Sequence, residues 1–244
     1  MNIVRKKLRI LCLHGMAQNA ILFEKKTAGF FQDIKEQVEL VYIRGPLKVL
    51  DPELVSLVER ATQVGESVSE EARPWAWWFI ANRKPMDSEG YFYGFKESVE
   101  YIQQVLLEQG PFDGIMGFSQ GACFTGYLAH MLEKRNGLIP PEFPHPPLKF
   151  AIIAGGFILT SQPATQSTYF LPNQKLETPS MHVIGEVDTI IPPERSDLLT
   201  SRFKNPTVFY HPGAHFVPKT QAARKILSEF LSSVIQDNQA QAHM

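Results

Sequence analysis

Residues 114–128 read GIMGFSQGACFTGYL, and this stretch decides the fold of the chain. Its apolar start predicts a buried strand, and the residues after the second Gly of GFSQG have the apolar spacing of a helix. Between the two, residues 117–121 fit the G-x-S-x-G pattern, in which a serine stands on a sharp turn from strand to helix. The turn lifts the Ser119 hydroxyl above the sheet, and the first N–H groups of the helix point at the same place. We therefore predict that Ser119 is a nucleophile rather than a serine in an ordinary turn.

Outward from this turn, short apolar runs alternate with longer amphipathic stretches. The alternation predicts an α/β-hydrolase fold, with a mostly parallel central sheet flanked by helices on both faces. The predicted strands are Leu8–Leu13, Val38–Ile43, Asp113–Gly117, Lys149–Ala154, Ser180–Ile184 and Thr207–Tyr210. The predicted helices are Phe23–Glu36, Gly94–Gln109, Ser119–Arg135, Pro193–Arg202 and Thr220–Val234.

The chain of 244 residues is long enough for one such core and too short for two ordinary domains. We expect a single domain over residues 1–235. A lid-like excursion of residues 45–93 follows the second strand, and its acidic part, 53–71, is weakly helical. Loops are expected at 138–147, which is rich in proline, and at 157–178. Residues 236–244 are predicted to form a frayed polar tail.

Composition argues against several classes of function. Lys and Arg total 24 against 25 Asp and Glu, so no excess of positive charge favours nucleic acid or an anionic membrane. The two cysteines, Cys12 and Cys123, are expected to pack in the core of a protein from a reducing compartment. We expect neither a secretory leader nor a membrane span, and a cytoplasmic location.

An activated serine needs a base, and that base needs an acid to orient it. In this fold the chain order is serine, acid, histidine. His215 lies in the loop after the last predicted strand, where a base can reach Ser119. His211 ends that strand and is the alternative, whereas His182 falls within a strand and is expected to be structural.

The acidic residue that orients the base is expected in the loop after the predicted strand Ser180–Ile184. Asp188 lies a few residues beyond Gly185, which lets the chain turn. Glu186 is the competitor, but it adjoins the strand end and is expected to point to solvent. We therefore predict Asp188 as the acid.

The oxyanion hole is predicted from two backbone N–H groups. One belongs to Gln120, the residue after the nucleophile. The other belongs to Met16, because Gly15 permits an unusual turn after the first strand. His14 precedes the nucleophile in the chain, so we expect it to brace this loop rather than to act as a base.

Five stretches together resemble the FSH group, or family of serine hydrolases, over residues from about 8 to about 230. They are residues 11–15, the tryptophans of 75–78, residues 110–122, Gly185 with Asp188 and Pro192, and HPGAHFVP at 211–218. The resemblance implies a cytoplasmic or nuclear carboxylesterase that needs no metal or cofactor. It implies the same triad of Ser119, Asp188 and His215. It also implies an alternative, because some fungal members release polyketide acyl groups from a carrier domain as thioesterases.

The aromatic segment around Trp75, Trp77 and Trp78 has two interpretations. It is either ordinary core and lid packing or an apolar wall that binds the acyl group of the substrate. We predict a small-molecule acyl ester or thioester as substrate, with an acyl carrier domain as the partner in the thioester case. A non-catalytic binding module on this fold would have lost a member of the triad, and this chain retains all three. The oligomeric state is left open.

Overall fold

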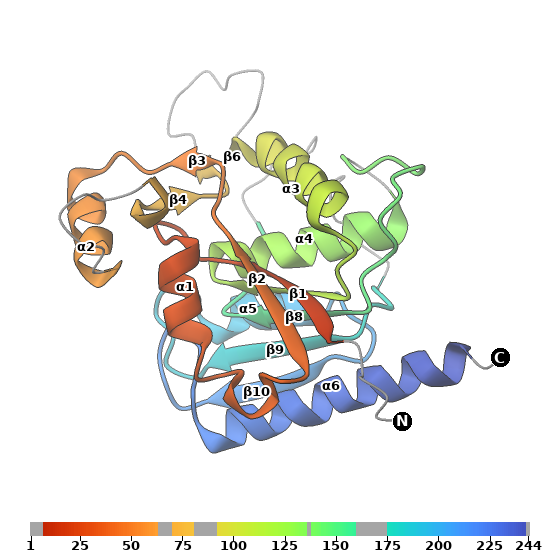
Figure 1. The fold of residues 1–244 in the computed structure, drawn as a ribbon. Coiled ribbons are helices and arrows are strands. Elements are labelled where there is room, and N and C mark those ends of the chain that lie inside the picture. The colour runs from red at the N-terminus through yellow and green to blue at the C-terminus, as the bar shows by residue number, and fades with distance from the viewer. Residues whose placement is uncertain (1–6, 63–69, 81–91, 136–137, 160–174, 243–244) are drawn as a thin grey trace.

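Six parallel strands form a sheet through the middle of the protein, in the order β10-β9-β8-β7-β1-β2 (Figure 1). Each strand lies within one residue of its predicted bounds. The strands are β1 (Leu8–Leu13), β2 (Val38–Ile43), β7 (Gly114–Phe118), β8 (Phe150–Ala154), β9 (Ser180–Gly185) and β10 (Thr207–His211).

The computed structural model describes residues 7–62, 70–80, 92–135, 138–159 and 175–242. Parts of the predicted excursion (63–69 and 81–91) and most of the predicted loop at 157–178 (160–174) lie outside these ranges. No helix within the described ranges is long and apolar enough to cross a membrane.

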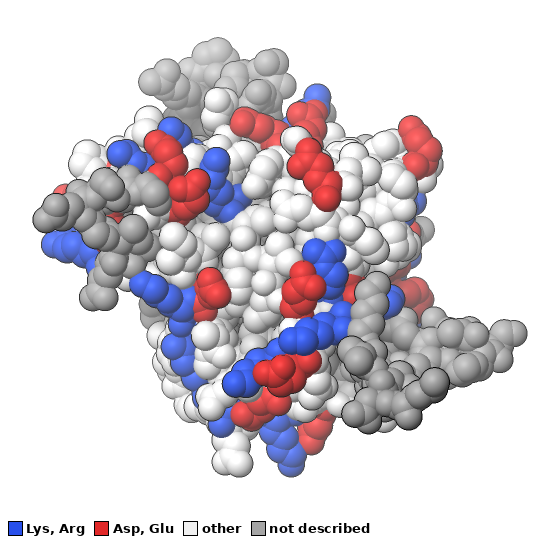
Figure 2. Space-filling model, viewed as in Figure 1, with Lys and Arg blue, Asp and Glu red and all other residues white. Residues whose placement is uncertain are grey.

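Helices cover both faces of the sheet. Successive side chains of a strand point to opposite faces, so a strand of continuous apolar residues needs a covering layer on each side. Leu11 and Leu13 of β1 join a buried cluster with α3 (Phe95–Gln109) and α4 (Gln120–Lys134). Ile10 and Cys12 join a second cluster with α1 (Ala20–Thr27) and α6 (Gln221–Ala242). Figure 1 shows α3 and α4 above the sheet and α6 below it. On the face shown in Figure 2, positive and negative side chains are interspersed.

The single helix predicted over Phe23–Glu36 is wrong. The structure ends α1 at Thr27 and places only a short 3₁₀ turn at Gln32–Ile34. Gly29 follows the end of α1, and glycine is about 1 kcal/mol less favourable than alanine inside a helix. The next residues, Phe30 and Phe31, are both buried, which two neighbours on a surface helix rarely achieve.

The excursion after β2 contains regular structure. It holds α2 (Pro52–Thr62) and a 3₁₀ turn at Glu70–Ala72. It also holds two small antiparallel pairs. In the first, β3 (Leu47–Lys48), which precedes α2, pairs with β4 (Trp75–Ala76), and in the second β5 (Phe79–Ile80) pairs with β6 (Phe92–Tyr93). At the other end of the chain, α6 continues to Ala242, so the predicted polar tail is helical as far as that residue.

The strand order reverses between β1 and β7, since β2 lies on one side of β1 and all later strands of the sheet lie on the other. In open parallel sheets, the loops after two such strands diverge and leave a crevice at their carboxyl ends. The loop after β1 begins at His14, and the turn after β7 carries Ser119. The fold therefore places these two segments side by side, above the edge of the sheet.

Candidate active site

Ser119 stands between β7 and α4 with φ of 54° and ψ of −116°. A non-glycine residue rarely adopts this conformation, which costs on the order of 1–3 kcal/mol and is found mostly at functional sites. The neighbouring glycines make the turn sterically allowed. A Cβ on Gly121 would lie 2.2 Å from the carbonyl oxygen of Leu13, and one on Gly117 would lie 2.2 Å from that of Gly121.

Asp188 and His215 form a short hydrogen bond. The Nδ1 of His215 lies 2.6 Å from Oδ2 of Asp188, and because a carboxylate only accepts, Nδ1–H is the donor. The other oxygen, Oδ1, accepts from the backbone N–H groups of Ile190 and Ile191, each at 2.9 Å. The Asp188 side chain is buried. The N–H groups of Ile190 and Ile191 therefore fix the orientation of the Asp188 carboxylate, and the carboxylate in turn fixes the imidazole ring of His215.

The Nε2 atom of His215 is buried and has no hydrogen-bond partner among the described residues. The imidazole lies over Gly155, where a Cβ would be 2.9 Å from its Cε1 and 3.8 Å from Oδ2 of Asp188. Ser119 is next to Gly155, because its N–H donates to the carbonyl oxygen of Ala154 at 2.9 Å. The structure thus brings the three predicted residues together around the ends of β7, β8 and β9.

The competing residues lie elsewhere. Glu186 is exposed, and its N–H donates to the carbonyl oxygen of His211. His211 is buried against the ring of Phe216 at 4.9 Å, and its Nδ1 accepts from the N–H of Gly213. His182 contacts Ser180 inside β9, and burial lowers its pKa to about 3.

The two predicted oxyanion donors flank Ser119. Gln120 is the first residue of α4, so its N–H has no partner within the helix. Met16 follows Gly15, where a Cβ would lie 3.0 Å from Phe118 and 3.3 Å from Cβ of Ser119. None of the described acceptors takes the N–H of Met16. Both groups are therefore free to face an oxygen beside Ser119.

His14 holds the loop after β1 in place. Its Nε2 accepts from the N–H of Gly45 at 2.9 Å, so Nδ1 carries the proton and donates to the carbonyl oxygen of Gly15 at 2.7 Å. The carbonyl oxygen of His14 accepts from Nε1 of Trp77 at 2.9 Å. Complete burial lowers the pKa of His14 to about 4, which keeps the ring neutral. These contacts show that His14 stabilises the loop after β1, as predicted.

The side chain of Gln120 connects the serine turn to the tryptophan segment, a contact that the sequence did not indicate. Its Oε1 accepts from the N–H of Trp77 at 2.9 Å, and its Nε2 donates to the carbonyl oxygen of Trp78 at 2.7 Å. The carbonyl oxygen of Trp77 accepts from the hydroxyl of Ser98 on α3. The backbone of the aromatic segment is thereby fixed to the residue after the predicted nucleophile.

A cavity of about 430 Å³ lies beside Ser119, and most of its wall is apolar. Of the three tryptophans predicted to bind substrate, only Trp78 lines it. Its lining residues are Met16, Trp78, Phe79, Ile80, Phe92, Ser119, Gln120, Phe157, Leu159, Ile190, Ile191 and Arg195. We call this space the acyl cavity.

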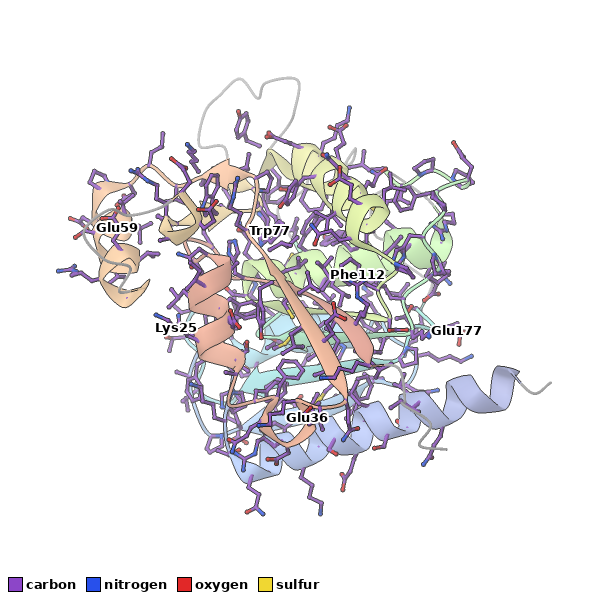
Figure 3. All side chains as sticks on the ribbon, in the orientation of Figure 1. Lys25, Glu36, Glu59, Trp77, Phe112 and Glu177 are labelled. Atoms are coloured by element: carbon purple, nitrogen blue, oxygen red, sulfur yellow. The ribbon has the colours of Figure 1, made fainter. Side chains whose placement is uncertain are left out.

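Trp75 and Trp77 do not line the acyl cavity and are packed elsewhere, as in the core-packing interpretation of this segment. Trp77 is fully buried, with its ring 5.3 Å from that of His14 and 5.4 Å from that of Phe124 (Figure 3). Trp75 lies under the guanidinium of Arg44, 4.0 Å from the ring centre. Within the described ranges, no three His, Cys, Asp or Glu side chains lie together as a metal site.

The fold is that of an α/β-hydrolase, and the arrangement of Ser119, Asp188 and His215 at the ends of its strands is typical of the serine esterases of this fold. A family model described as serine hydrolase (FSH1) matches residues 1–226. The chain therefore belongs to the FSH1 serine hydrolase family, as its motifs predicted.

Named relatives agree with this assignment. Esterase OVCA2 of Danio rerio is 35% identical over 232 residues, which cover 92% of this chain and 96% of that protein. Esterase CG5412 of Drosophila melanogaster is 33% identical over 234 residues, covering 96% and 77% respectively. The crystal structure of Zea mays acyl-protein thioesterase 2 superposes with a TM-score of 0.58 at 18% identity, covering 93% of this chain and 94% of that one, which confirms the fold. The protein is thus an ester-cleaving enzyme.

Proposed function

We propose that Ser119, His215 and Asp188 hydrolyse carboxylic esters of apolar acyl groups as nucleophile, base and acid. The observation that carries the proposal is the 2.6 Å bond between Asp188 and His215, which leaves a buried Nε2 without a partner among the described residues. The imidazole ring lies 4.7 Å from the ring of Phe118, the residue before Ser119. A neutral imidazole held in this tautomer is what proton removal from a serine requires.

In the first half of the reaction, Oγ of Ser119 attacks the ester carbonyl carbon while Nε2 of His215 takes its proton. The carbonyl oxygen becomes an oxyanion that accepts from the N–H groups of Met16 and Gln120. The bond to the alcohol oxygen then breaks, and the proton on Nε2 passes to that oxygen. The products of this half are a free alcohol and an acyl group on Ser119.

Water completes the cycle. His215 takes one proton from the water as its oxygen attacks the acyl carbon, and it returns a proton to Oγ of Ser119 when the acid leaves. The resulting carboxylic acid carries the water oxygen, and the enzyme regains its starting state.

The apolar wall of the acyl cavity supports an apolar acyl group. Burying each methylene of an acyl chain is worth about 0.8 kcal/mol, and Trp78, Phe92 and Leu159 offer the surface for it. The same chemistry would cleave a thioester. No feature of the described surface favours a carrier domain, so the free ester is the substrate that we propose.

Replacement of Ser119 by alanine tests the proposal. Fluorophosphonate probes react with activated serines, so the wild-type protein should label and hydrolyse p-nitrophenyl butyrate, whereas Ser119→Ala should do neither. The expected loss in kcat is on the order of 10⁶. A folded Ser119→Ala protein that still labels and turns over would disprove the assignment.

A further inference from the structure

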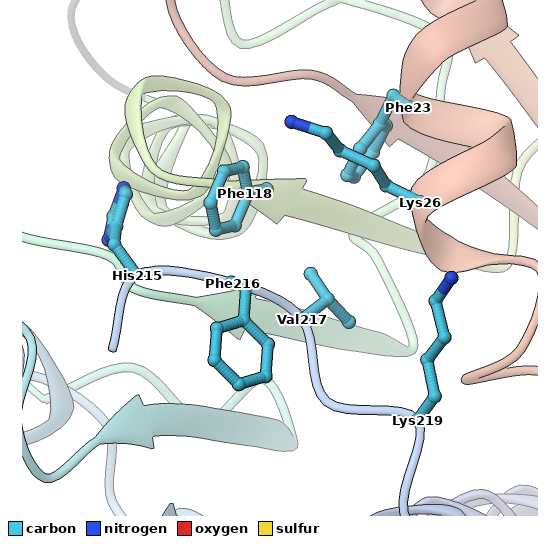
Figure 4. A pocket seen from close by; sticks show the side chains of 7 residues that line it. All are labelled: Phe23, Lys26, Phe118, His215, Phe216, Val217 and Lys219. Atoms are coloured by element: carbon cyan, nitrogen blue, oxygen red, sulfur yellow. The ribbon is translucent and has the colours of Figure 1, made fainter. Parts of the chain in front are cut away.

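A second cavity, of about 400 Å³, lies beside His215. Its walls come from α1, from the end of β7 and from the segment after β10 (Figure 4). We call it the lysine cavity, and its lining residues are Phe23, Lys26, Phe118, His215, Phe216, Val217 and Lys219. It shares no lining residue with the acyl cavity, and Phe118 in its wall directly precedes Ser119 in the wall of the acyl cavity. The two spaces are therefore separate, and both adjoin the predicted catalytic cluster.

Two lysines give this cavity its charge. None of the ion pairs between described residues involves Lys26 or Lys219. Figure 4 shows the amino end of Lys26 directed toward Phe118 and that of Lys219 directed toward α1. Partial burial lowers the pKa of Lys26 from its ordinary value, as expected for an ammonium without a counter-charge.

The position of Lys219 is built into the fold. Its side chain lies over Gly29, where a Cβ would be 2.8 Å from its Cδ. Its carbonyl oxygen accepts from the guanidinium of Arg224 at 2.6 Å, and Arg224 also pairs with Asp33. Gly29, just beyond the end of α1, therefore leaves the space in which this lysine reaches the cavity.

We propose that the lysine cavity binds the alcohol half of the ester and that this half carries an anion, a carboxylate or a phosphate. The inference rests on the proposed function, because His215 must deliver its proton to the departing alcohol oxygen, which places the alcohol against the imidazole. The acyl half then occupies the acyl cavity. Phe216 and Val217 contact the carbon chain between the ester oxygen and the anion, and the two ammonium groups neutralise its charge.

Matched alkyl esters test this inference. Hexanoate esters of 4-hydroxybutanoate and of 4-hydroxybutyl phosphate are compared with the hexanoate ester of 4-hydroxybutanamide, whose size is similar and whose charge is zero. We expect kcat/KM to be about tenfold higher for an anionic ester, a preference that shrinks with added salt because the lysines are partly exposed. The carboxylate and phosphate arms tell which anion fits.

The lysine variants supply the decisive comparison. The double variant Lys26→Met, Lys219→Met should hydrolyse the three esters at equal rates, so that the preference for the anionic esters is lost. Lys25→Met, which removes a charge from the same helix outside the cavity, should keep the preference (Figure 3).

Two outcomes would overturn the inference. They are equal rates on charged and neutral esters in the wild-type protein, and a preference that survives in the double variant. Failure of the proposed function is distinct, because a Ser119→Ala protein would then still turn over the neutral ester.

Discussion

Both oxygens of the Asp188 carboxylate are in use, one accepting from His215 and the other from two backbone N–H groups. In Asp188→Asn, the amide would need to present its oxygen to Ile190 and Ile191, which turns its NH₂ toward Nδ1 of His215. The imidazole would then carry its proton on Nε2, where it cannot accept one from Ser119. We predict a loss in kcat of roughly 10⁴ with little change in melting temperature.

Glu186→Gln is the matched control for this prediction. Its side chain is exposed, and its backbone contact with His211 does not depend on the carboxylate. Steady-state kinetics on p-nitrophenyl butyrate should show nearly wild-type activity. Equal losses in the two variants, or a larger loss at Glu186, would transfer the role of acid to Glu186.

The residues of the predicted triad could be selected from the sequence because each follows a strand and their chain order is fixed by the fold. The second function of Gln120 could not. Its side chain contacts Trp77 and Trp78, 43 and 42 residues earlier in the chain, and no local pattern indicates which carbonyl lies beside an amide. The shared position of Lys26 and Lys219 could not be predicted either. They line one cavity only because α1 and the segment after β10 lie on either side of it.

At the scale of elements, the segment that joins β4 to β5 has one tryptophan in the core and one in the wall of the acyl cavity. Trp78 lines the acyl cavity, whereas Trp77 is fully buried in the core. Trp78→Ala should therefore flatten the dependence of kcat/KM on acyl length, measured with p-nitrophenyl esters from acetate to decanoate, and should spare acetate. Four more buried carbons could otherwise raise kcat/KM by about two orders of magnitude at about 0.8 kcal/mol each.

Trp77→Ala provides the contrast within the same segment. Removing a fully buried indole should cost on the order of 3–5 kcal/mol of unfolding free energy and should leave the ratio of decanoate to acetate unchanged in the protein that remains folded. Chemical denaturation measures the first quantity. If both variants lost activity equally on every ester, the segment would be core only.

The bounds of the buried strands were predicted more accurately than those of the first helix. The strands are continuous apolar runs, and their bounds differ from the prediction by one residue at most. The helix predicted over Phe23–Glu36 was wrong because its apolar residues have helical spacing on both sides of Gly29, while the structure turns the chain there to bury Phe30 and Phe31. Periodicity alone does not show where a chain changes direction.

For the whole molecule, buried histidines predict that the free energy of unfolding decreases in acid, and His14 and His182 are the most strongly affected. Burial lowers the pKa of His14 to about 4 and that of His182 to about 3. An unfolded histidine takes up a proton near pH 6.5, whereas these folded ones stay neutral well below that value. The unfolded state therefore gains protons first, and stability is lost as pH falls from about 6.5 toward 4.

Urea denaturation at pH 7.5 and pH 5 measures this effect. The expected loss in unfolding free energy is about 2 kcal/mol for each histidine, since one pKa unit corresponds to about 1.4 kcal/mol. His182→Leu removes one of these groups and should reduce the loss by about 2 kcal/mol. An unfolding free energy that is equal at both pH values in the wild-type protein would contradict the prediction.

The candidate active site and the two ends of the described chain lie at opposite edges of the sheet. The candidate site lies beyond the carboxyl ends of the strands, whereas β1 begins at the opposite edge of the sheet. Helix α6 runs back toward that same edge after β10, and its last turns extend past the rest of the molecule (Figure 1). A tether attached beyond Ala242 would therefore anchor the enzyme to a bead or electrode with both cavities facing the bulk solution. Immobilisation through Lys26 or Lys219 would instead block one of them.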